Sequence, residues 1–93
     1  MAIRIEIPSA LRLHACGSAV VVIEQPCASV SDALDALASQ CPGVVDRVRT
    51  EQGELREHVN VFVDEENSRF SGGLGAPVAP GSTIMILAAI SGG

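Results

Sequence analysis

The most distinctive chemical group in this sequence is the α-carboxylate of Gly93, which follows Ser91 and Gly92 at the end of the chain. Glycine lacks a Cβ atom, so a Gly-Gly tail can extend or turn sharply, and a partner can approach its backbone closely. When extended, residues 90–93 span roughly 13 Å. A tail of that length could pass through a narrow channel and present its carboxylate at a distant active site. The alternative is a frayed terminus that happens to be glycine, because chain ends are often poorly ordered.

Other patterns that could carry chemistry have simpler structural interpretations. His14 and His58 are separated in the sequence and are expected to be surface or strand histidines. Residues 71–75 have the composition of a phosphate-binding loop, but no Lys follows and Pro77 prevents a helix from starting, so a turn is favoured. The acidic residues 64–66 lack calcium-loop spacing and indicate a solvated turn. Without a nucleophile elbow or zinc-hydrolase motif, we expect no catalytic residue and no metal site.

Composition limits the class of protein further. Ninety-three residues make one small domain, whose core must be aliphatic because Phe62 and Phe70 are its only aromatic residues. The formal net charge is −5, and all six basic residues are Arg. Nucleic-acid binding requires clustered Lys and Arg, so an acidic chain without a basic run argues against it. Such a chain suits a carrier or a partner for a basic surface.

The cysteines and the N-terminus indicate a cytoplasmic protein. Cys16, Cys27 and Cys41 are odd in number and form no C-x-x-C pair, which argues against a disulfide framework or a zinc site. We expect small buried or half-buried thiols in a reducing cytosol. The N-terminus lacks the apolar run of a signal peptide, and no stretch approaches membrane-spanning length, so no membrane association is expected.

The hydrophobic periodicity predicts four strands and one main helix. Alternating or β-branched segments predict strands at residues 2–7, 18–23, 58–63 and 83–88. The inward positions are Ile3, Ile5 and Ile7 in the first strand and Val59, Val61 and Val63 in the third. A helix is predicted where apolar residues recur at helical spacing, at Val30, Ala33, Leu34, Leu37, Ala38 and Cys41. Ser29 and Asp32 fit a capping box at its start, and Pro42-Gly43 is expected to stop it.

The remaining segments are expected to be connections. The expectations are a turn at residues 10–17, a short helical turn at 44–49, a polar loop at 50–57, a turn at 64–67, a brief edge segment at 68–70 and irregular structure at 71–82. This order predicts an α+β domain in two layers, with one main helix packed across a mixed sheet. The apolar first and last strands are expected to pair in parallel at its centre. We assign residues 1–90 to this domain and residues 91–93 to a flexible tail.

Several segments together carry a family resemblance: Ile7-Pro8-Ser9, Leu11-Arg12, residues 58–66, the run Arg69-Phe70-Ser71-Gly72-Gly73-Leu74, residues 84–87 and Ser91-Gly92-Gly93. In this arrangement the chain resembles the β-grasp, or ubiquitin-like, fold. More narrowly, it resembles the bacterial sulfur-carrier proteins of the ThiS/MoaD family, and within it the CysO type, the carrier of a cysteine-biosynthesis route. Relatives often have Pro just after the last strand, where this chain has Ala88-Ala89, which leaves the tail less rigid.

The resemblance implies that the protein is a substrate of other enzymes. An E1-like adenylating enzyme of the ThiF/MoeB type would use ATP to adenylate the Gly93 carboxylate, and a sulfur donor would displace AMP to leave a thiocarboxylate. Ile90, Ser91 and Gly92 would thread the partner's active site. The sulfur would pass to an accepting synthase, for which an enzyme that resembles cysteine synthase is the candidate. No bound cofactor is implied, and the free protein is expected to be a monomer.

The resemblance also places partner recognition on the sheet face opposite the helix. If Ile84 and Ile86 pack on the helix, then Met85 and Leu87 point outward beside Phe62. An apolar patch of these three residues beside the tail is typical of a partner site. The alternative is that these side chains pack against a loop or are singly exposed.

Four other functions remain open at this stage. Within the family, the alternatives are the small subunit of molybdopterin synthase and a thiamine sulfur carrier. A ubiquitin-like protein modifier would be conjugated through Gly93 to other proteins, although without Lys it cannot form Lys-linked chains with itself. A β-grasp iron–sulfur ferredoxin would need four Cys ligands, and the chain has three.

Overall fold

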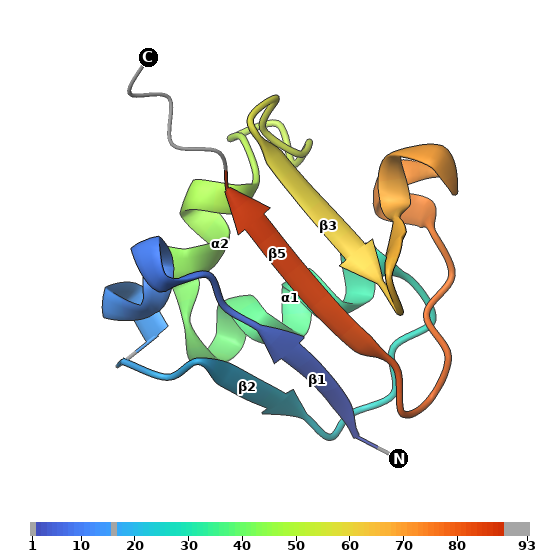
Figure 1. Cartoon of the computed structure of the whole chain (residues 1–93), viewed down its shortest axis with the longest axis horizontal. Coiled ribbons are helices and arrows are strands. Elements are labelled where there is room, and N and C mark those ends of the chain that lie inside the picture. The colour runs from blue at the N-terminus through green and yellow to red at the C-terminus, as the bar shows by residue number, and fades with distance from the viewer. Residues whose placement is uncertain (1, 16, 89–93) are drawn as a thin grey trace.

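The computed structural model describes residues 2–15 and 17–88, which form one sheet with two α-helices and three short 3₁₀ helices (Figure 1). The strands are β1 (Ile3–Glu6), β2 (Val20–Ile23), β3 (Val59–Val63), β4 (Glu66–Asn67) and β5 (Thr83–Ala88). The α-helices are α1 (Val30–Gln40) and α2 (Pro42–Val48), and the 3₁₀ helices are η1 (Ser9–Ala15), η2 (Ser68–Phe70) and η3 (Gly73–Gly75).

The sheet has the strand order β2-β1-β5-β3-β4, so the first and last strands lie at its centre. β1 and β5 run parallel, with Ile5 opposite Ile84, and both side chains are fully buried. The other neighbouring pairs are antiparallel. The predicted parallel central pair is confirmed, and it brings the carboxyl ends of β1 and β5 to the same edge of the sheet.

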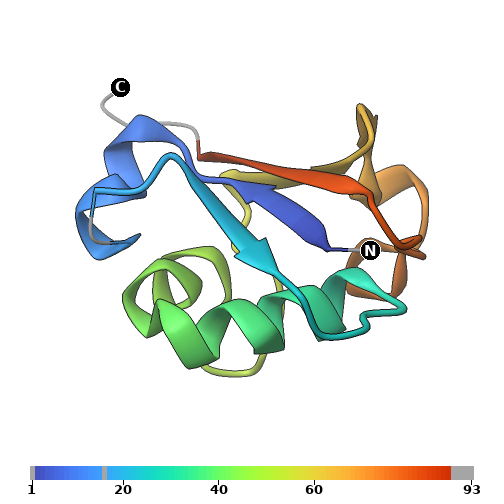
Figure 2. The ribbon, with the colours of Figure 1, turned by 90° about the horizontal axis from the view of Figure 1, so that it is seen from below.

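Both α-helices lie on one face of the sheet, and the opposite face carries no α-helix (Figure 2). The inward residues of the strands meet the apolar stripe of α1 in one core. Its largest fully buried side chains include Ile3, Ile5, Ile23, Leu34, Leu37, Ile84 and Ile86. Each side chain of this size contributes about 1.5–3 kcal/mol when it leaves water. The two-layer β-grasp arrangement expected from the sequence is confirmed.

The predicted capping-box-like start of α1 is confirmed, and α1 ends at Gln40, just before Pro42-Gly43, as expected. Ser29 Oγ accepts a hydrogen bond from Asp32 N at 3.2 Å, and Asp32 Oδ2 accepts one from Ala28 N at 3.1 Å. Pro42 does more than end α1, because it is also the first residue of a second helix, α2. Proline suits that position, where its missing N–H has no helical partner and its fixed φ is already helical. The helical turn expected at residues 44–49 is therefore a two-turn helix that begins earlier.

The turn expected at residues 64–67 is shorter than predicted. Asp64 and Glu65 alone turn the chain, with φ of 48° and 75°, and Glu66 and Asn67 then pair with the end of β3. Two consecutive left-handed residues match the right-handed twist of a tight hairpin. Asp64 Oδ1 also accepts a hydrogen bond from Thr83 N at 2.9 Å, which ties this turn to the start of β5.

Three other connections contain 3₁₀ helix that the sequence did not indicate. The turn expected at residues 10–17 contains η1, and the irregular segment expected at 71–82 contains η3. The edge segment expected at residues 68–70 is wrong, because this stretch is η2. Asn67 Oδ1 accepts a hydrogen bond from Arg69 N at 3.0 Å, so the chain curls into a helical turn instead of extending β4.

Candidate functional site

β5 determines where the predicted tail leaves the domain. Gly93 and the threading residues Ile90, Ser91 and Gly92 lie outside the described residues. The last described residue, Ala88, is paired with Val59 at the start of β3. The tail therefore departs from the edge of the sheet at which β1 and β5 end and β3 begins.

The predicted apolar patch lies on the helix-free face of the sheet. Along β5, Ile84 and Ile86 are fully buried, whereas Met85 is half-buried and Leu87 is 43% exposed. Phe62, also half-buried, lies directly opposite Met85 in the antiparallel β3–β5 pair. Phe62, Met85 and Leu87 are thus neighbours on one surface that leads toward the departure point of the tail. Their role in partner binding stays a prediction.

The same face continues across the sheet with a polar strip and a further apolar side chain. Glu6 of β1 is opposite Met85 on one side and Val20 on the other. Val22, the next residue of β2 with the same parity, is 48% exposed. Sequence reasoning did not assign Val22 to this face, although the alternation of β2 carries that signal.

Two strongly exposed apolar residues were also missed. Leu13 on η1 is 83% exposed and Phe70 on η2 is 85% exposed. Both belong to 3₁₀ helices, whose position was not predicted, so no periodicity in the sequence assigns either side chain to the surface.

Arg69, the first residue of the run Arg69-Phe70-Ser71-Gly72-Gly73-Leu74, has a structural role. Its guanidinium donates hydrogen bonds to the side chain of Asn60 and to three main-chain oxygens, those of Val59 at 2.6 Å, Arg56 at 2.9 Å and Glu57 at 3.2 Å. These bonds attach η2 to the start of β3. A single planar guanidinium can serve several carbonyls in this way because its donors form a fixed fork.

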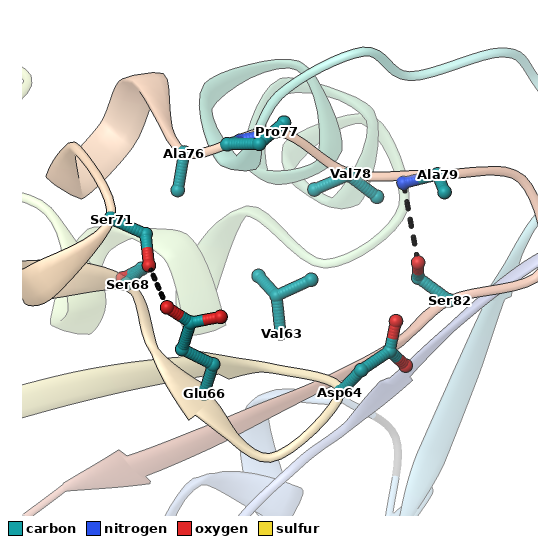
Figure 3. A pocket seen from close by; sticks show the side chains of 10 residues that line it. All are labelled: Val63, Asp64, Glu66, Ser68, Ser71, Ala76, Pro77, Val78, Ala79 and Ser82. Carbon is teal, nitrogen blue, oxygen red and sulfur yellow. Dashed lines mark hydrogen bonds between the residues drawn. The ribbon is translucent and has the colours of Figure 1, made fainter.

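A hollow of about 370 Å³ lies at the opposite end of the sheet, between the β3–β4 turn and residues 76–82 (Figure 3). Ser71 Oγ donates to Glu66 Oε1 at 2.6 Å, and Ser82 Oγ accepts from Ala79 N at 3.2 Å. Ser68 also lines the hollow, and its Oγ has no hydrogen-bond partner in the described part of the chain. The hollow lies beside the start of β5 and far from Ala88. This hollow has no connection with chemistry at the carboxyl end of the chain.

The histidines and cysteines form no reactive centre in the described part of the chain. His14 packs against Gly43, where an added Cβ would approach the His14 Cβ to 3.2 Å, and His58 is exposed. Cys27 and Cys41 are buried, and burial, with a smaller contribution from the Asp32 charge, raises the pKa of the Cys27 thiol above its ordinary value of 9.0. A raised pKa suppresses the thiolate and hence reactivity. Cys16 lies outside the described residues.

The described segments contain neither a metal-binding cluster nor a membrane-spanning helix. Residues 2–15 and 17–88 contain no group of three or more His, Cys, Asp or Glu side chains that could hold a metal ion. None of the helices in these segments is long and apolar enough to cross a membrane.

Comparison with known proteins gives matches over the whole chain. The ThiS family model matches residues 6–93. The sulfur carrier protein CysO of Mycobacterium tuberculosis is 33% identical over 99 residues, which cover 100% of both chains. Small archaeal modifier protein 1 of Haloferax volcanii is 38% identical over 66 residues, 71% of each chain. A chain in the crystal structure of the Amycolatopsis orientalis BexX/CysO complex superposes with a TM-score of 0.87 at 38% identity, covering 98% of this chain and 99% of that one.

The fold and these matches define a small ubiquitin-like carrier protein. The chain belongs to the ThiS family of sulfur carriers. Members of this family are not enzymes themselves; they are substrates of E1-like activating enzymes, and their chemistry proceeds through a thiocarboxylate.

Proposed function

We propose that an E1-like enzyme of the ThiF/MoeB type adenylates Gly93 of this protein, and that the resulting thiocarboxylate donates sulfide for the biosynthesis of cysteine or a related sulfur metabolite. The observation that carries the proposal is the family match through Gly93, together with the full-length similarity to CysO. The proposed acceptor is a sulfur-accepting synthase that resembles cysteine synthase.

The proposed chemistry overcomes the poor reactivity of a carboxylate. An oxygen of the Gly93 carboxylate attacks the α-phosphorus of ATP, and pyrophosphate leaves. The acyl-adenylate has AMP as a good leaving group, so a sulfur nucleophile displaces it and a C–S bond replaces the C–O bond. The product carries a nucleophilic terminal sulfur that can attack an acceptor. The side chains of the domain take no part in these steps, and ATP belongs to the activating enzyme.

Recognition and delivery are the proposed tasks of the chain. The patch of Phe62, Met85 and Leu87 holds the partner, while Ile90, Ser91 and Gly92 cross the distance to its active site. Residues 1–90 act as the domain and residues 91–93 as the tail. The patch suits this task because it combines an aromatic and two flexible apolar side chains on a face that no α-helix covers.

Similarity to small archaeal modifier protein 1 supports a second candidate, a protein modifier joined through Gly93 to amines of other proteins. Both functions would share the acyl-adenylate and differ in the nucleophile that takes the acyl group, sulfur in one and nitrogen in the other. Since the chain contains no Lys, such a modifier would not form Lys-linked chains of itself.

Fragment-ion mass spectrometry of the C-terminal peptide tests the proposal after incubation with the activating enzyme, ATP and a sulfur source. Intact mass is insufficient, because replacing oxygen by sulfur adds nearly the same mass as oxidising a Cys or Met. The expected result is a gain localised to Gly93 and alkylation there by a thiol-reactive reagent. A variant that lacks Gly93 is the control and should remain folded but unmodified. Adenylation without sulfur would favour the modifier, and no modification would contradict both functions.

A further inference from the structure

Most arginines in this acidic protein have no carboxylate partner. Within residues 2–15 and 17–88, the ion pair between Arg49 and Asp35 at 2.7 Å is the single salt bridge. Arg69 bonds the main-chain oxygens described above. Three further guanidinium groups also bond main-chain oxygens: Arg12 Nε donates to Ile7 O at 3.0 Å, Arg47 to Gly43 O at 3.0 Å, and Arg56 to Asp46 O at 2.9 and 3.2 Å. Such bonds position a guanidinium but leave its charge uncompensated.

These three arginines come from distant parts of the sequence to the edge from which the tail departs. Arg12 lies on η1, which follows the carboxyl end of β1 and packs against α2, the helix that carries Arg47. Arg47, Arg56 and His58 line one hollow of about 280 Å³ together with Ala88, the last described residue of β5. Figure 1 shows η1, α2 and the start of β3 around the end of β5. We call Arg12, Arg47 and Arg56 the cationic collar.

Carboxylates, unlike the collar arginines, occur at both ends of the domain. The turn at the start of β5 exposes Asp64, Glu65 and Glu66, and Glu24 and Asp32 lie beside the start of β1. Carboxylates also flank the collar: Asp46 lines the hollow, and Glu51, Glu54 and Glu57 belong to the loop before β3. In the hollow itself two guanidinium groups face one carboxylate, so its balance is positive although the chain is negative overall.

We propose that the cationic collar docks on acidic side chains of the partner protein, at the mouth of the channel that receives the tail. This inference rests on the proposed function. The partner chemistry follows from charge, because planar guanidinium groups with free donors match carboxylates. Arg47 and Arg56 line the hollow that contains Ala88, the last described residue before the proposed tail. A negative carrier that approaches an acidic rim is oriented by its charge asymmetry, with the collar leading and the acidic turn trailing.

Two charge-reversal variants distinguish an effect of the collar from an effect of the total net charge. Arg47→Glu acts in the collar, and Arg4→Glu acts at the start of β1; both residues are exposed, and both variants change the net charge equally. With the full chain and a ThiF/MoeB-type enzyme at low salt, Arg47→Glu should slow association about 5-fold, while Arg4→Glu should change it less than about 2-fold. High salt should remove the difference. Equal effects of the two variants would overturn the proposal.

A second variant checks the collar at another position, and a simple probe tests it without the activating enzyme. Arg56→Gln retains a hydrogen-bond donor toward Asp46 O, so the melting temperature should not change. This variant should also weaken binding of the ThiF/MoeB-type enzyme. Hexaglutamate titrated into the ¹⁵N-labelled wild-type protein should shift the amide signals of residues 12, 47, 56 and 58, and Arg47→Glu should suppress these shifts. Shifts elsewhere, or none, would overturn the collar proposal. If the collar binds hexaglutamate but no activating enzyme adenylates Gly93, the proposed function fails and the acidic docking preference stands.

Discussion

Phe62 and Met85 are direct cross-strand neighbours on the helix-free face of the sheet. Directly opposed residues of an antiparallel pair have their Cβ atoms about 4.5–5.5 Å apart, so the two side chains form one surface unit. Leu87, two residues along β5, extends this unit toward Ala88. The pair therefore lies outside the main core, on the surface that leads toward Ala88, the last described residue.

Phe62→Asp should weaken binding of the activating enzyme about tenfold or more, because a central aromatic anchor would be replaced by a charge. The melting temperature should fall only modestly, since Phe62 is half-buried and does not face the helices. Isothermal titration calorimetry and thermal unfolding monitored by circular dichroism measure the two effects separately.

The adjacent Val61 provides the matched control for that substitution. Val61 is fully buried and points to the helix side, so Val61→Asp should unfold the protein by placing an unpaired charge in the core. If Phe62→Asp unfolded the domain as completely as Val61→Asp, the two faces of β3 would have been assigned incorrectly.

Alanine substitutions of two neighbouring residues on β5 should lower the free energy of unfolding by different amounts. Ile86 is fully buried, so Ile86→Ala should lower the free energy of unfolding by about 2–5 kcal/mol. Leu87 is 43% exposed, and Leu87→Ala should cost less than about 1 kcal/mol. Urea unfolding of both variants decides the matter, and similar losses would contradict the alternation along this strand.

Much of this fold could be predicted because its signals are local. Alternation placed the buried isoleucines of β1 and β5, and the spacing from Val30 placed α1 with its Ser29 cap. The features that were missed depend on contacts between distant segments. η2 forms where Asn67 caps it and Arg69 binds carbonyls near β3, and neither interaction leaves a periodic signal in the sequence.

The candidate site likewise combines features that the sequence predicts with features that depend on contacts between distant segments. The proposed chemistry of Gly93 comes from the family resemblance, whereas the parity of Met85 and Leu87 follows from the order of residues alone. The cationic collar does not, because Arg12, Arg47 and Arg56 are far apart in an acidic sequence without a basic run. They share one end of the domain only because β1 and β5 pair in parallel and α2 packs against η1.

Two serines should respond oppositely to replacement by alanine. Ser29→Ala removes the N-cap bond to Asp32 N and should cost about 1 kcal/mol, which lowers the melting temperature by about 4–8 °C. Ser68 is buried, and its Oγ has no hydrogen-bond partner in the described part of the chain, so Ser68→Ala should be neutral or stabilising. Differential scanning calorimetry measures both changes. A loss for Ser68→Ala as large as that for Ser29→Ala would mean that the Ser68 hydroxyl is bonded in solution.

Stability above pH 9 should report on Cys27. Burial first, and the charge of Asp32 second, raise the pKa of its thiol above 9.0 in the folded protein. The unfolded chain therefore releases this proton more readily, so the stability contribution is complete below pH 9.0 and is lost as the pH rises through the folded pKa. Chemical denaturation of the wild type between pH 8 and 11 should show this decline, and Cys27→Ala should reduce it. The chain has no Lys or Tyr, and Cys16 and Cys41 are present in both proteins, so the difference between the two declines reports on Cys27. An identical decline in Cys27→Ala would assign the effect to another group.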